Sequence, residues 1–275
     1  MTSHPSPDPL AGAPLRLRRL VDELIRLPGV EALALGGSRA SGTHRADSDW
    51  DLGVYYRDGF RPADVRALGH PGTVVELGEW GGGIFNGGAW LDLDGTRVDL
   101  LWRELAVVEH EIDEAVAGRW RIEPLMFHLT GIPTYLLLAE LAVNRVLHGD
   151  LPRPDYPSAL REAAGRGWFG RAELTLGFAR SAHAAQSRLT ACLGLVAVGA
   201  AELAHAAAAT GGRWVTNDKS LLALGGMDGV DALLRALPGD PSPQQLQSLV
   251  DATVELGRQA MAGGAGEDVS PSPPR

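Results

Sequence analysis

The sequence predicts an α+β protein, in which an N-terminal domain with a small mixed β-sheet and flanking helices precedes a C-terminal α-helical bundle. Helical and strand-like hydrophobic patterns alternate as far as Leu101. From Arg103 onward the strand patterns stop, and segments rich in Ala, Leu, Glu and Arg follow with helical period. A chain of 275 residues, with 45% apolar and 21% charged residues, is large enough for two modest packed domains.

The first domain is expected over residues 15–105, after a disordered leader at residues 1–14 that is rich in Pro and Ser. Leu15 to Leu27 places apolar side chains at three-to-four spacing, which predicts an amphipathic helix, and Pro28-Gly29 ends it. Short strands are then expected at Val30–Leu35, Asp51–Tyr56 and Thr73–Leu77.

A hairpin is predicted at the end of this domain, after the glycine-rich turn at residues 81–83. Asp94-Gly95 is a strong two-residue turn signal, and it separates the strand patterns Trp90–Leu93 and Thr96–Leu101. The N-terminal part is therefore expected to be a mixed α/β unit.

The second domain is expected to be a helical bundle over residues 106–262, followed by a disordered tail at residues 263–275. Segments rich in Gly and Pro, including Gly165–Gly170, divide its helical patterns. The long helices are predicted at Thr134–His148, Arg171–Gln186, Arg188–Ala208 and Pro243–Met261.

Composition limits the cell compartment in which the protein is expected and the kinds of partner that it is expected to bind. Cys192 is the single cysteine, which excludes an intramolecular disulfide and favours a cytoplasmic protein. Leu189–Ala209 resembles a membrane span, but Glu202 and His205 interrupt it. We therefore expect a helix buried in the bundle and no interaction with a membrane. The formal net charge of −9 makes nucleic acid an unlikely partner. The oligomeric state can be a monomer or a homodimer.

The segment with the clearest chemistry joins Gly36-Gly37-Ser38-Arg39 to Ser48-Asp49-Trp50-Asp51. Glycines at a strand end allow a tight turn and a close approach to a ligand, and the following amides at a helix start can bind phosphate oxygens. Asp49 and Asp51 are two residues apart on an extended segment and therefore project from one face. Hard carboxylate oxygens of this kind favour Mg²⁺.

Together these two motifs resemble the DNA polymerase β-type nucleotidyltransferase superfamily, whose mark is a Gly-Gly-Ser turn followed by Asp-x-Asp. The resemblance covers the first domain and implies a third carboxylate on a later strand, for which Asp99 is the match. It implies that Asp49, Asp51 and Asp99 bind two Mg²⁺ ions and carry catalysis. Asp92 and Asp94 compete with Asp99 for the third position, and the hairpin register decides among them.

The triphosphate is expected to contact Gly36, Gly37, Ser38, Arg39 and Ser48, with Arg45 as a further possibility. Lys219 is the single lysine and could bind a phosphate, although Asn217 or Asp218 beside it could simply cap a helix. The general base is either Asp99 or Glu140, because relatives use either the third carboxylate or a glutamate of the helical domain. Trp168, Phe169 and Trp214 could stack on a substrate or pack in the core.

Within the superfamily, the helical second half most resembles the aminoglycoside, kanamycin and lincosamide nucleotidyltransferases. The resemblance therefore implies Mg²⁺-dependent transfer of a nucleoside monophosphate from a nucleoside triphosphate, with ATP favoured, to a hydroxyl of a small-molecule acceptor. An aminoglycoside or similar antibiotic would suit an acidic protein. The alternatives are a protein adenylyltransferase that modifies a partner protein and a nucleotide-binding pseudoenzyme.

Overall fold

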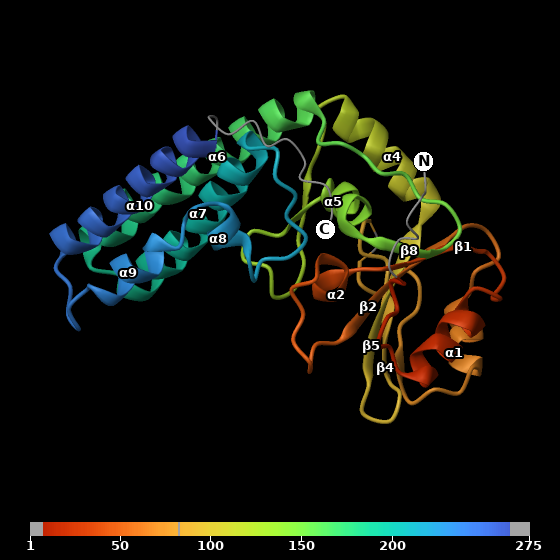
Figure 1. Cartoon of the computed structure of the whole chain (residues 1–275). Coiled ribbons are helices and arrows are strands. Elements are labelled where there is room, and N and C mark those ends of the chain that lie inside the picture. Colours follow the sequence, from red (N-terminus) through yellow and green to blue (C-terminus); the bar gives the residue numbers. More distant parts are fainter. Residues whose placement is uncertain (1–7, 82, 265–275) are drawn as a thin grey trace. The chain divides into compact units, whose positions relative to one another are not determined.

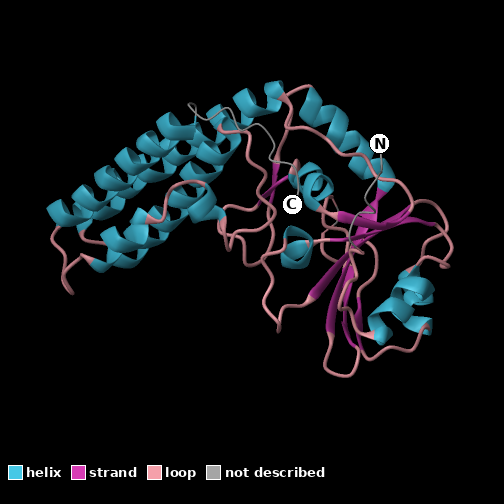
Figure 2. Cartoon of the chain, in the orientation of Figure 1, coloured by secondary structure: helices cyan, strands magenta, loops and turns pink. Residues whose placement is uncertain are grey.

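The computed structural model describes residues 8–81 and 83–264 and divides the chain into two compact units (Figure 1). The first unit combines Met1–Ile112 with Leu137–Pro154, and the second combines Asp113–Leu136 with Asp155–Arg275. The larger sheet lies in the first unit and the long helices in the second (Figure 2). The α+β fold class expected from the sequence is confirmed.

A six-stranded mixed sheet forms the centre of the first unit. Its strands are, in spatial order, β3 (Gly72–Val74), β4 (Gly88–Asp92), β5 (Arg97–Glu104), β2 (Trp50–Tyr56), β1 (Val30–Leu35) and β8 (Arg145–His148). The central strands β2 and β5 are parallel, and all the other neighbours are antiparallel. The five strands predicted from the sequence are present, with shifts at their ends.

One face of this sheet is covered by helix α1 (Leu15–Leu24). Leu17, Leu20 and Leu24 pack in one apolar cluster with Leu52 of β2 and Leu100 of β5. Helix α3 (Pro62–Ala67) adds Val65 to the same cluster. Because side chains alternate along a strand, the odd-numbered residues of β2 and β5 face the opposite side of the sheet.

The opposite face carries the short helix α5 (Leu136–Val143), whereas the short helix α2 (Gly37–Ser41) follows β1 and adds Ala40 to the apolar cluster of the first face. At the end of α5, Asn144 Nδ2 donates a hydrogen bond of 3.2 Å to the Tyr55 hydroxyl of β2. Glu140 of α5 forms an ion pair with Arg103 of β5. Helix α5 therefore covers this face near Tyr55 and Arg103. These two residues lie four positions after Asp51 on β2 and four positions after Asp99 on β5.

The predicted helix Thr134–His148 and the predicted domain boundary at residue 105 are both wrong in part. The helix ends at Val143, and residues 145–148 form β8, which pairs with the edge strand β1 through Ala34 and Val146. Pairing with an open strand edge satisfies the backbone groups of both segments, a long-range gain that helical periodicity does not reveal. Residues 137–154 consequently belong to the first unit.

The chain ends differ from the expected disordered leader and tail where the structure describes them. Leu10 is buried against the first core, and its amide donates a 2.9 Å hydrogen bond to Asp8 Oδ1. Helix α10 continues to Gly264. The predictions for residues 1–7, for Gly82 of the glycine-rich turn and for residues 265–275 lie outside the described residues.

Three long helices build the second unit: α6 (Ser158–Phe178), α7 (Leu189–Thr210) and α10 (Pro243–Gly264). A π-helical turn at Ala179–His183 and a 3₁₀ turn at Ala184–Gln186 join α6 to α7, and α8 (Leu221–Leu224) and α9 (Gly229–Arg235) precede α10. Helix α4 (Leu105–Val116) crosses the boundary between the units, and β6 (Ile122–Glu123) pairs with β7 (Ile132–Pro133).

The glycines at 165–170 do not break a helix, as the sequence had suggested, because α6 runs through them. A Cβ at Gly165 would lie 2.6 Å from Thr210 Oγ1, and one at Gly167 would lie 2.7 Å from Trp120 Cζ2. Neighbouring side chains thus require the absence of a Cβ at these two positions. Helix α6 therefore starts at Ser158, well before the predicted Arg171.

Helix α7 is, among the described residues, the one helix long and apolar enough to cross a membrane by length and composition. Most of its residues are buried inside the second unit, against α6 and α10. It also buries Glu202, whose pKa is raised by burial and whose Oε1 lies 3.3 Å from Arg171 Nε. These contacts are typical of the core helix of a folded bundle.

His205 of α7 predicts a pH dependence of stability. Its ring is buried and stacks on Trp168 at 4.4 Å between centroids, and burial, with a smaller contribution from His128, lowers its pKa from 6.5 to about 4. Between these values the unfolded chain binds a proton that the folded chain does not. The free energy of unfolding should therefore fall as pH is lowered from about 6.5 to 4, by up to about 3 kcal/mol.

Urea denaturation of the full chain at pH 7.5, 6 and 5 measures this loss. The variant His205→Phe keeps an aromatic ring in the stack but cannot bind a proton, so its stability should depend less on pH over the same interval. An unchanged pH dependence in this variant would contradict the assignment to His205.

Candidate active site

Two aspartates meet on the face of the sheet that α1 leaves uncovered. Asp51 of β2 is the register partner of Asp99 of β5 in the parallel pair at the centre of the sheet. Neighbouring strands lie about 4.8 Å apart, and side chains at paired positions leave the same face. The structure therefore places these two carboxylates side by side, as the resemblance implied.

The glycine turn between β1 and α2 lies directly against Asp51. The Gly36 amide donates a 2.8 Å hydrogen bond to the Asp51 carbonyl oxygen. Gly37 has a φ of +60°, and a Cβ at this position would collide with Asp51 Oδ2 and lie 2.6 Å from its Cγ. Only glycine leaves the carboxylate of Asp51 its space and adopts this backbone conformation without strain. Position 37 thus links the turn and the acidic pair.

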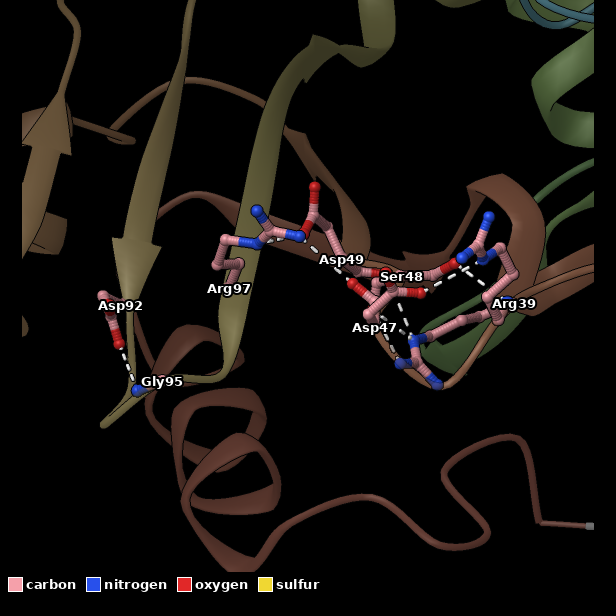
Figure 3. Close-up of polar contacts among 8 residues, drawn as sticks. Arg39, Asp47, Ser48, Asp49, Asp92, Gly95 and Arg97 are labelled. Carbon is pink, nitrogen blue, oxygen red and sulfur yellow. Dashed lines mark hydrogen bonds and ion pairs between the residues drawn. The ribbon is translucent and has the colours of Figure 1, made fainter.

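Asp49 extends this pair by one position on the same face. It precedes β2 and lies opposite Arg97 of β5, which is two residues before Asp99. Asp49 Oδ1 forms an ion pair of 2.6 Å with Arg97 Nε, and Arg97 Nη2 donates a 3.1 Å hydrogen bond to the Asp47 carbonyl (Figure 3). The four side chains form a two-by-two array, with Asp49 beside Arg97 and Asp51 beside Asp99.

Arg39 and Ser48 have structural contacts that hold the loop before β2. Arg39 Nη2 donates a 2.6 Å hydrogen bond to the Ser48 carbonyl, and its Nε donates to the Asp49 carbonyl at 3.1 Å (Figure 3). Its guanidinium also lies 4.1 Å from the centroid of the Trp50 ring. Ser48 Oγ accepts a 2.9 Å hydrogen bond from the Arg45 amide. Their expected contacts with a nucleotide remain predictions.

The main chain of Ser38 stabilises the short helix α2. Its carbonyl accepts hydrogen bonds from the Thr43 amide at 2.9 Å and from Ser41 Oγ at 3.2 Å. Arg45, by contrast, is exposed and pairs with Asp47 at 3.4 Å. Ser38 therefore lies in α2, directly after the Gly37 position that contacts Asp51, and its contact with a nucleotide stays a prediction.

The hairpin register separates Asp99 from its two competitors. Asp92 Oδ1 accepts a 2.5 Å hydrogen bond from the Gly95 amide, which closes the turn (Figure 3). Asp94 has a φ of +53°, and its carboxylate forms an ion pair with Arg16. The Asp92 side chain closes the turn and the Asp94 side chain pairs with α1, which leaves Asp99 as the hairpin aspartate beside Asp51.

Glu140 is bound to a buried arginine. Arg103 Nε and Nη2 donate hydrogen bonds of 2.7 and 2.6 Å to the two carboxylate oxygens of Glu140. The side chain of Arg103 is 1% exposed, so this bidentate pair neutralises a charge within the core. Arg103 is also four residues beyond Asp99, a separation of about 13 Å along a strand. These contacts argue against Glu140 as the general base.

The other predicted residues lie in the second unit. Lys219 is exposed, and Asn217 Oδ1 accepts a 3.3 Å hydrogen bond from the Ser220 amide just before α8. Ser220 is the N-cap residue of α8 and no side chain caps this helix, so the capping role considered for Asn217 or Asp218 is wrong. Trp168 is fully buried and donates a 2.8 Å hydrogen bond to the Tyr135 hydroxyl. Trp214 packs on Tyr156 at 4.2 Å, and Phe169 packs against the helical core. A nucleotide contact by Lys219 stays a prediction.

Sequence reasoning missed Arg97 as a member of the site. The signal was available, because Arg97 and Asp99 are two residues apart on one strand and therefore share a face. The structure pairs Arg97 with Asp49, which lies outside its own strand. The register between β2 and β5 decides this pairing, and the sequence does not contain it.

The donor set suits a divalent cation that prefers oxygen ligands. Across residues 8–81 and 83–264, no group of three or more His, Cys, Asp or Glu side chains is close enough to hold a metal ion as they stand. Asp51 and Asp99 nevertheless supply adjacent carboxylates, and the missing Cβ of Gly37 leaves room beside Asp51. Carboxylate oxygens in this number suit Mg²⁺, which keeps several of its waters.

Comparison with known proteins gives one family match and one similar solved structure. Residues 17–115 match a family model described as a nucleotidyltransferase domain, a segment that contains Gly37, Asp49, Asp51 and Asp99 but not Glu140 or Lys219. Among solved structures, a nucleotidyltransferase-like protein from Exiguobacterium sibiricum 255-15 is 13% identical, with a TM-score of 0.43 over 90% of this chain and 75% of that chain. No curated protein has significant sequence similarity to this chain. The match over residues 17–115 supports a transferase with a nucleotidyltransferase domain in this part of the chain.

Proposed function

We propose that this protein transfers a nucleoside monophosphate from a nucleoside triphosphate, with ATP favoured, to a hydroxyl group of a small-molecule acceptor. The observation that carries the proposal is the pairing of Asp51 with Asp99 beside the Gly37 turn. A glycine turn suited to phosphate, next to two carboxylates, is the arrangement that nucleotidyl transfer requires, and this supports the proposal. The match of residues 17–115 to a nucleotidyltransferase domain supports it.

In the proposed reaction, the acceptor oxygen attacks the α-phosphorus in line, the bond from that phosphorus to the bridging oxygen breaks, and pyrophosphate leaves. Asp51 and Asp99, with Asp49, would hold two Mg²⁺ ions, which neutralise the triphosphate and lower the pKa of the attacking hydroxyl. Asp99 accepts the proton of that hydroxyl, directly or through water. Amides of the Gly36–Ser38 turn orient the phosphate oxygens.

The acceptor is proposed to be cationic and polyhydroxylated, as an aminoglycoside is. The formal net charge of −9 supports a cationic acceptor over a nucleic acid. The resemblance to antibiotic nucleotidyltransferases suggests antibiotic resistance as the biological role.

A transfer assay tests both the nucleotidyl transfer itself and the proposed class of acceptor. The protein is incubated with Mg²⁺, each α-labelled nucleoside triphosphate in turn, and panels of aminoglycosides, lincosamides and proteins; the Asp51→Asn variant serves as the blank. Label on an aminoglycoside or lincosamide is the expected result. Label on proteins alone would replace the small acceptor by a protein, and no transfer to any acceptor would favour a nucleotide-binding pseudoenzyme.

A further inference from the structure

The contact between Arg97 and Asp49 places a cationic side chain at a carboxylate that the proposed reaction needs. Arg97 Nε lies 2.6 Å from Asp49 Oδ1, on the face that also carries Asp51 and Asp99. A guanidinium and a divalent cation compete for the same carboxylate oxygens, because both are held by charge. Arg97 therefore occupies a ligand position of the proposed cation site.

The geometry of this pair suits displacement. Asp49 Oδ1 is shielded from solvent and makes no hydrogen bond to a described residue, so its contact with Arg97 is an ion pair without hydrogen-bond alignment. The side chain of Arg97 is 64% exposed, which gives it room to rotate away. Ion pairs between partly exposed side chains contribute little to stability, and a cation that replaces Arg97 would keep a charged partner at the shielded Asp49 Oδ1.

A pocket beside the pair gives the released guanidinium of Arg97 room to meet a ligand. It has a volume of about 370 Å³, and its wall includes Arg39, Ser48, Asp49 and Arg97. Arg39 is fixed there by the Ser48 and Asp49 carbonyls, whereas Arg97 is held by one carbonyl and by Asp49. Asp47 and Asp49 in the same wall balance the two arginines, so Arg97 has an uncompensated charge for an anion such as a triphosphate only when a cation replaces it at Asp49.

We propose that Arg97 is a displaceable counter-ion that couples cation binding to nucleotide binding, an inference that rests on the proposed function. Without a cation, Arg97 neutralises Asp49 and keeps the site closed to other cations. A divalent cation at Asp49 and Asp51 releases Arg97, and its guanidinium then binds the triphosphate. Each ligand thereby strengthens the other, because the coupling between two sites is reciprocal.

Titration with Mn²⁺ in the absence of nucleotide, followed by electron paramagnetic resonance, tests the first half of this proposal. The Arg97→Gln variant removes the competing charge and should bind Mn²⁺ about three- to tenfold more tightly than the wild type.

Arg45→Gln is the matched control. It removes a positive charge from the loop before β2, which also carries Asp49, but Arg45 does not pair with Asp49. Its affinity for Mn²⁺ should change by less than about twofold.

Binding of a non-hydrolysable nucleoside triphosphate, with and without Mn²⁺, tests the second half. Arg97→Gln should bind the analogue more weakly than the wild type, and Mn²⁺ should enhance that binding by a smaller factor. The counter-ion role is overturned if Arg97→Gln binds Mn²⁺ no more tightly than the wild type, or if Arg45→Gln gains as much.

The Asp51→Asn variant separates failure of this inference from failure of the proposed function. Loss of Mn²⁺ binding in Asp51→Asn, together with unchanged binding in Arg97→Gln, would keep the metal site and remove the role of Arg97. Mn²⁺ binding that survives in Asp51→Asn would overturn the metal site itself. Circular dichroism spectra of all variants check that each one is folded.

Discussion

Replacing Asp51 with asparagine is expected to lower turnover by about 10²-fold or more, because one transition-state electrostatic group is lost. The carboxylate lies beside Asp99 and against the Gly37 turn, where a metal ligand has no substitute. Asparagine has nearly the same shape, so the packing against Gly37 is kept and the fold should remain intact. Pyrophosphate release measures turnover, and thermal denaturation checks the fold.

The matched control for this change is Asp58→Asn, which removes one carboxylate from the exposed turn after β2. Its turnover should stay within about twofold of the wild type, as expected for a surface charge screened by salt. Wild-type turnover in the Asp51→Asn protein would refute the assignment of this carboxylate to catalysis. Asp49→Asn should also lower turnover, since Asp49 is proposed to hold the same cations.

Replacing Glu140 with alanine is expected to lower the free energy of unfolding by about 3–5 kcal/mol, because it leaves the buried guanidinium of Arg103 without its partner. Arg103 is 1% exposed and donates two of its hydrogen bonds to Glu140. Turnover of the folded fraction should remain within several-fold of the wild type. Urea denaturation and pyrophosphate release measure the two effects separately.

The surface pair of Glu162 and Arg166 supplies the control. Both side chains are well exposed, and Glu162→Ala should change stability by less than about 0.5 kcal/mol. The Glu140→Gln variant keeps a hydrogen-bonding side chain and addresses the base hypothesis. If this variant folds with near wild-type stability but loses about 10²-fold in turnover, Glu140 is the base and the structural interpretation is wrong.

Local sequence patterns were enough to predict those elements whose structure is decided by residues close together along the chain. The helix after Leu15, the strands around Asp51 and Asp99, and the turn at Asp94-Gly95 all depend on hydrophobic period and turn chemistry. The motifs carried the catalytic hypothesis for the same reason: each motif is a short segment whose spacing places its side chains on one face.

Long-range contacts decided what local patterns could not. Residues 145–148 have helical spacing in the sequence, but the open edge of β1 draws them into the sheet as β8. Gly165 and Gly167 resemble helix breaks, but close neighbours from distant segments make them packing positions inside α6. The sequence allows Glu140 as a base, whereas the structure bonds it to Arg103, which is 37 residues away along the chain.

The sequence by itself determined the α+β class, the glycine turn and the spacing of Asp49 and Asp51, because these features follow from backbone preference and from spacing within one segment. Only the tertiary structure decided the register of β2 against β5, which sets Asp51 beside Asp99 and Asp49 beside Arg97. Strand pairing joins segments that are distant along the chain, and a shift of one residue would turn every side chain to the other face.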